Sequence, residues 1–129
     1  MKGDDIVNRL LDQAMTCLNL ASRLESSPAG RHIARQLIRC ATSTGANYEE
    51  GRSAESPADF IHKIGIAAKE QRETLWWLRV IERGKVASCQ DLDRSIDEAN
   101  ELVAILVASA RTARQRANRP RRLDGSDRQ

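Results

Sequence analysis

Apolar residues recur at intervals of three and four along most of the chain, which is the spacing of one face of an α-helix. A first series covers residues 6–24 and consists of Ile6, Val7, Leu10, Leu11, Ala14, Cys17, Leu18, Ala21 and Leu24. A second begins near Ala29 or Gly30 and consists of Ile33, Leu37, Cys40, Ala41, Thr44 and Tyr48. Pro28 and the serines before it interrupt the pattern, because the residue before a proline avoids the helical region. We therefore predict two helices with a break at 26–30.

A third helix has the clearest start in the chain. Ser56 stands as its N-cap, Pro57 occupies the first helical position, and Asp59 follows three residues after the cap. Its core stripe is Phe60, Ile64, Ala67, Gln71, Leu75 and Leu78, and a fourth series is Leu92, Ile96, Ala99, Val103, Leu106, Val107 and Ala110. Short connections at 51–56 and 84–88 place neighbouring helices antiparallel. The prediction is an all-α fold, an up-down-up-down four-helix bundle over residues 1–113.

The third helix carries a second apolar face. This face lies about 120–180° from the core stripe and consists of Ile66, Trp77 and Val80, with Glu70 and Glu73 between them. Two apolar faces need two partners, and a neighbouring subunit would cover the second. We predict that the chain forms a homo-oligomer with Trp77 as an interface anchor; the alternative is a surface tryptophan packed on its own helix.

A row of polar residues follows the second helix: Gln36, Ser43, Asn47 and Glu50. Steps of seven, four and three keep these residues on one line beside the apolar stripe. Such a row suits either a binding surface or a hydrogen-bonded seam at a helix or subunit boundary. The sequence favours the seam.

Positive charge is concentrated at the C-terminus. The net charge is +3, and the segment 114–129 alone contributes +4, so residues 1–113 carry −1. The tail has few apolar residues, and we predict that it is a disordered, Arg-rich segment. The candidate nucleic-acid-binding residues are arginines of the tail and a row on the second helix: Arg31, Arg35, Arg39, Arg114, Arg116, Arg119, Arg121 and Arg122. The alternatives are a solubilising tail and arginines that pair with acids of a neighbouring helix or subunit.

Catalytic chemistry has little support in the sequence. Glu49 and Glu50 are adjacent and point about 100° apart on a helix, and no Ser, Cys or His has nucleophile spacing. Cys17, Cys40 and Cys89 are scattered, which predicts reduced thiols and no zinc site. We expect no enzymatic activity, no cofactor and no metal. The first residues lack the pattern of a signal peptide and no apolar run could cross a bilayer, which predicts a cytoplasmic protein without membrane contact.

Two stretches resemble a known family. QLIRCATSTGANYEEG and AESPADFIHKIGIAAKEQRETLWWL are similar to the 23S rRNA-intervening sequence proteins, a four-helix-bundle family first known from open reading frames inserted in large-subunit ribosomal RNA genes. The residues on the family's polar patterns are Gln36, Arg39, Ser43, Asn47 and Glu50 in the second helix, and Phe60, Lys69, Glu70, Glu73 and Leu78 in the third.

The resemblance implies a ring of five subunits with no established enzymatic activity. It also implies kinship to the accessory protein of diversity-generating retroelements, a basic pentamer that binds nucleic acid and a reverse transcriptase. The nearly neutral body of this chain departs from that relative. Two functional classes follow: a self-assembling scaffold that binds protein partners, or an RNA- or DNA-binding accessory protein that uses the arginines of the second helix and the tail.

Overall fold

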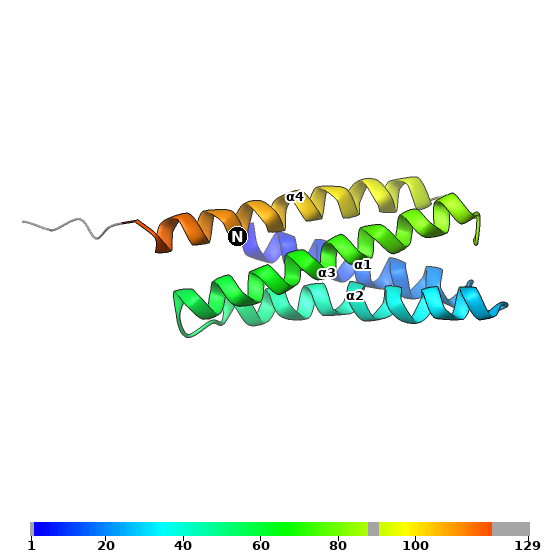
Figure 1. The fold of residues 1–129 in the computed structure, drawn as a ribbon, viewed down its shortest axis with the longest axis horizontal. Coiled ribbons are helices and arrows are strands. Elements are labelled where there is room, and N and C mark those ends of the chain that lie inside the picture. Colours follow the sequence, from blue (N-terminus) through cyan, green and yellow to red (C-terminus); the bar gives the residue numbers. More distant parts are fainter. Residues whose placement is uncertain (1, 88–90, 120–129) are drawn as a thin grey trace, which may run out of the picture.

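The computed structural model describes residues 2–87 and 91–119. Its four helices are α1 (Lys2–Ser22), α2 (Pro28–Arg52), α3 (Pro57–Gly84) and α4 (Leu92–Ala117). They lie side by side along one long axis (Figure 1), and the part of the chain that the structure describes contains no strand. The predicted all-α fold is confirmed, and the order of the helices is consistent with an up-down bundle.

The caps explain where two of the helices begin. Ser27 and Ser56 have extended backbones, and their side chains accept hydrogen bonds from the backbone N–H groups of Gly30 and Asp59. In each case a proline takes the first helical position, where a missing N–H costs nothing. The start of α3 is therefore the one that the sequence predicts.

Several helix ends differ from the prediction by a few residues. α1 ends at Ser22, earlier than predicted, and a tight turn then buries Leu24. α4 continues through Ala117, so Arg114 and Arg116 are helical, and the predicted domain boundary after residue 113 falls inside this helix. Its extra turn follows Ala110, whose burial keeps this end of α4 packed on the bundle. Residues 120–129, the rest of the predicted tail, lie outside the described residues.

The helices do not pack equally. α3 packs against both α2 and α4, and α1 packs against α2, whereas α1 and α4 meet over a much smaller contact. Arg9 spans that weaker seam, with its guanidinium paired to the carboxylates of Glu98 and Glu101 on α4. The Arg9 pairs thus bridge a seam along which hollows remain between α1 and α4.

The core consists of two apolar clusters, one toward each end of the bundle. The first contains Leu20, Leu24, Leu37, Leu78 and Ile81, and the second contains Leu10, Ile64, Leu102 and Leu106. The buried polar residues lie at intermediate positions along the helices: Gln13, Thr44, Gln71 and Thr74. Each finds a hydrogen-bond partner, which is the condition for burying a polar group at low cost.

The amides of Gln13 and Gln71 bond to each other twice. Nε2 of Gln13 lies 2.8 Å from Oε1 of Gln71, and Nε2 of Gln71 lies 2.7 Å from Oε1 of Gln13. Nε2 of Gln71 also donates to the backbone oxygen of Ala99 at 3.2 Å. One polar contact therefore ties α1, α3 and α4 together inside the bundle.

The buried face of α2 is confirmed at every predicted position, but that of α1 is partly wrong. Leu11 is 58% exposed and Leu18 is 36% exposed, while Gln13 and Leu20 are buried in their place. The helix is rotated about its axis relative to the prediction, and the inward-facing Gln13 bonds to Gln71. This rotation leaves an apolar stripe on the outside of α1.

Candidate functional site

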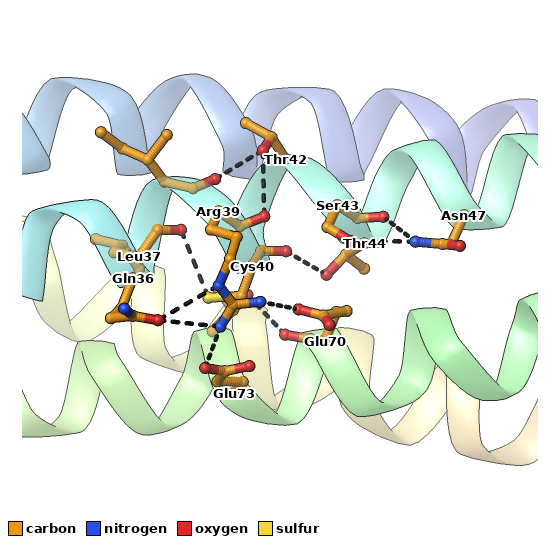
Figure 2. Close-up of polar contacts among 12 residues, drawn as sticks. Gln36, Leu37, Arg39, Cys40, Thr42, Ser43, Thr44, Asn47, Glu70 and Glu73 are labelled. Atoms are coloured by element: carbon orange, nitrogen blue, oxygen red, sulfur yellow. Dashed lines mark hydrogen bonds and ion pairs between the residues drawn. The ribbon is translucent and has the colours of Figure 1, made fainter.

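The most connected polar cluster lies between α2 and α3 and is centred on Arg39 (Figure 2). Nη1 of Arg39 lies 3.0 Å from Oε2 of Glu70, and Nη2 bonds to Glu73. The guanidinium also donates to Oε1 of Gln36, at 3.3 Å from Nε and 3.2 Å from Nη2. The structure thus brings together residues from three predicted sets. Gln36 belongs to the polar row and Arg39 to the candidate nucleic-acid-binding residues, while Glu70 and Glu73 belong to the predicted interface.

Trp77 belongs to the same cluster. Its indole N–H faces Glu73 at 3.4 Å, and its ring meets His32 of α2 edge to face, with the ring centres 5.9 Å apart. Trp77 is half-buried and packs against the first core cluster. The tryptophan predicted as an interface anchor therefore already has contacts within its own chain. Ile66 and Val80, the other two apolar residues of the predicted second face of α3, are also half-buried.

The cluster shifts the pKa of one acid, Glu73. The hydrogen bond from Arg39 holds the pKa of Glu73 below its ordinary value, with smaller contributions from Trp77 and Lys69. Because the folded pKa is the lower one, the stabilisation is complete above the unfolded value and is lost as pH falls through the folded value. Arg39 is thus paired within the chain. This agrees with the alternative given in the sequence analysis, in which the arginines pair with acids of a neighbouring helix.

This arrangement predicts a pH-dependent effect of Arg39→Gln. We expect the variant to lower the free energy of unfolding by about 1 kcal/mol at neutral pH, a small value because the pair is partly exposed to solvent. The difference from wild type should shrink below the ordinary glutamate pKa of 4.5, where Glu73 begins to protonate. Urea unfolding at neutral and acidic pH measures both values. Arg35→Gln, an exposed cation on the same helix, is the matched control, and an equal loss in that variant would contradict the assignment.

The remaining polar-row residues form separate contacts. The Asn47 amide donates to the backbone oxygen and to Oγ of Ser43, at 2.9 and 3.1 Å. Glu50 pairs with Lys63 of α3, with Nζ and Oε2 2.7 Å apart. The row therefore comprises three independent contacts rather than one connected network.

The predicted nucleic-acid residues are scattered over the structure. Arg31 donates to the backbone oxygen of Glu25 at 3.2 Å, and Arg35 is exposed. Arg114, Arg116 and Arg119 are exposed near the end of the described chain, at the opposite end of the bundle from the start of α2, while Arg121 and Arg122 lie outside the described residues. With Arg39 occupied by two glutamates, the α2 row does not form an unpaired basic surface.

A metal-binding arrangement is absent from the described residues. They contain no group of three metal-ligating His, Cys, Asp or Glu side chains. Cys17 and Cys40 are buried free thiols, and burial raises the pKa of Cys17 to about 12, which keeps that thiol protonated and weakly nucleophilic. Cys89 lies outside the described residues. None of the described helices carries an apolar stretch that could span a bilayer.

Sequence reasoning missed two exposed features. One is the stripe on α1 formed by Leu11, Met15 and Leu18, which are 58%, 56% and 36% exposed. The other is Trp76, which is 60% exposed on α3. A signal for each existed in the spacing, since Leu11, Met15 and Leu18 recur at four and three, and Trp76 lies about 100° from Trp77 on the helix.

The chain is similar to known proteins in both sequence and structure. The profile of the family described as 23S rRNA-intervening sequence protein matches residues 4–108. The chain belongs to this family. A solved relative is the crystal structure of a protein with unknown function from the S23 ribosomal protein family of Bacteroides thetaiotaomicron, which is 30% identical, with a TM-score of 0.77, over 86% of this chain and 99% of that one. A search of curated proteins finds no significant match.

Family membership confirms the resemblance that the two sequence stretches carry. The matched range covers α1 from its third residue, all of α2 and α3, and most of α4. It stops before Arg114, so the family match does not extend to the last turns of α4. The solved relative supports the four-helix fold, and its function is described as unknown.

Proposed function

We propose that this 23S rRNA-intervening sequence family member is a non-catalytic, self-assembling bundle that acts as a scaffold or protein-interaction module. The observation that carries the proposal is the exposed apolar stripe of Leu11, Met15 and Leu18 on α1. A soluble protein seldom leaves three large apolar side chains adjacent on one helix face unless another surface covers them.

A hollow lies beside this stripe and adds shape to it. It occupies about 670 Å³ between α1 and α2, and its lining includes several small residues: Ala14, Thr42, Gly45 and Ala46. A methyl group built on Gly45 would meet its nearest neighbour, Leu10, at an ordinary 3.6 Å. Packing inside the chain therefore does not require glycine there, and the missing side chain leaves room for an incoming one.

The occupant that fits best is a second copy of the chain. A closed ring needs two different surfaces on each subunit, and the half-buried flank of α3 with Ile66 and Val80 would be the second. Asp4, Glu49 and Arg52 at the rim of the hollow provide charges of both signs for a polar border. The subunit number of five rests on the family resemblance.

The proposal predicts that Met15→Glu disrupts assembly. A carboxylate in a desolvated contact without a partner costs several kcal/mol, so the assembly should break down to a smaller species while the helical circular dichroism spectrum is retained. Sedimentation velocity measures the change. Thr16→Glu adds the same charge to an exposed position on another side of α1 and should assemble like wild type. Normal assembly of Met15→Glu would show that the α1 stripe is not an assembly contact.

A further inference from the structure

The outer face of α3 carries cations around an exposed tryptophan. At 3.6 residues per turn, these residues lie within about 60° of one line, and all are exposed: Lys69, Arg72, Trp76, Arg79 and Arg83. We call this set the α3 basic stripe. It extends over about 21 Å, from a rise of 1.5 Å per residue.

The acids of the same segment have partners outside the stripe. Glu70 and Glu73 pair with Arg39 of α2. Glu82 is directed to Asp93 of α4, and that contact raises the pKa of Glu82, although Arg79 and Arg83 act in the opposite direction. Among the described residues, none of the four stripe cations lies within ion-pair distance of a carboxylate. Like charges three and four residues apart repel each other on a helix, so an anionic partner would relieve this repulsion.

A shallow hollow of about 440 Å³ extends the stripe toward the start of α3. Ala58, Ile61 and Gly65 line it together with Lys69 and Arg114. A Cβ built on Gly65 would lie 3.7 Å from Nη2 of Arg114. The Arg114 guanidinium of α4 thus lies over α3 beside position 65, where it adds a fifth cation to the line.

We propose that the α3 basic stripe binds single-stranded nucleic acid, with Trp76 stacking on a base and the flanking cations contacting phosphates. An exposed indole inside a row of cations provides the two components that such sites combine, a stacking platform and a positive track. The row is continuous over several turns of one helix, which suits a polyanion. This surface differs from the α2 row and, apart from Arg114, from the predicted tail, and it is independent of the α1 surface proposed for assembly.

The test compares full-length variants that lose the same charge from three places. Arg72→Gln/Arg79→Gln changes the stripe, Arg31→Gln/Arg35→Gln changes α2, and Arg121→Gln/Arg122→Gln changes the tail. Binding is measured by fluorescence anisotropy with a labelled mixed-sequence RNA, and the corresponding DNA, of about 12 nucleotides over a range of salt concentrations. Sedimentation velocity reports whether each variant keeps its assembly state.

We expect the stripe variant to lose at least about tenfold in affinity and its salt dependence to weaken by about 0.7 per lost phosphate contact. The other two double variants should each retain more of the wild-type affinity. Trp76→Ala should weaken binding by about tenfold, from the value of one base stack, and Trp76→Phe should restore most of it. In a Trp77→Phe background, Trp76 fluorescence should be quenched by the RNA.

Three results would overturn the proposal. The first is no binding by the intact protein at low salt, and the second is an equal or larger loss in the α2 or tail variant. The third is a change of assembly state in the stripe variant with unchanged affinity per subunit, which would make the stripe a contact between copies of the chain. Binding of RNA and DNA alike, or of RNA alone, supports the site, and a difference between them shows whether the 2′-hydroxyl is contacted.

Discussion

Gly30→Ala is expected to lower the free energy of unfolding by about 3 kcal/mol, at the upper end of the usual range for overpacking a core. Gly30 is buried in the first turn of α2, and a Cβ there would lie 1.9 Å from the backbone oxygen of Leu24. Neither backbone can move alone, because Leu24 is buried in the first core cluster and Gly30 donates its N–H to the Ser27 cap.

Gly65→Ala is the matched control for this change. Gly65 lies inside α3, and a methyl group there meets its nearest neighbour, Arg114, at an ordinary 3.7 Å. Alanine favours a helix interior over glycine by about 1 kcal/mol, so this variant should be slightly more stable than wild type. Urea unfolding of both variants at equal protein concentration gives the comparison. A Gly30→Ala protein as stable as Gly65→Ala would show that the chain does not turn from α1 into α2 in this way.

The second large effect concerns the buried amide pair. Gln71→Leu should cost about 2 kcal/mol, because it leaves the amide of Gln13 buried without its two hydrogen bonds. Gln13→Leu should cost a similar amount, since Gln71 then keeps only its bond to the backbone of Ala99.

The double variant separates pairing from packing. In Gln13→Leu/Gln71→Leu both amides are replaced by side chains that need no partner, so we expect it to be more stable than either single variant. A double-mutant cycle by chemical unfolding measures this coupling. Strictly additive losses would show that the two amides do not depend on each other.

The sequence predicted the helices well where the signal was local. The cap at Ser56, the proline after it and the periodic stripe of α2 all depend on residues a few positions apart, and all are present in the structure. The rotation of α1 was not predictable in the same way. Its apolar residues cover a wide arc, and the edge that turns inward contains Gln13, whose partner Gln71 is 58 positions away along the chain.

The candidate site shows the same limit. Arg31, Arg35 and Arg39 repeat every four residues, but only the structure reveals that Arg39 faces two glutamates of α3. Trp76 and Trp77 are adjacent in sequence, yet the one predicted to be an anchor packs against His32 while its neighbour is exposed. Whether a side chain is paired or exposed depends on its partners on other helices. The periodicity along one helix carries no information about those partners.

Self-assembly is the central claim, and the mass of the intact protein in solution tests it most directly. The subunit has a mass of 14.4 kDa. Light scattering after size exclusion at micromolar concentration should give a multiple of this mass, and five subunits if the ring implied by the family resemblance forms. A single species at the mass of one subunit would contradict the proposed assembly.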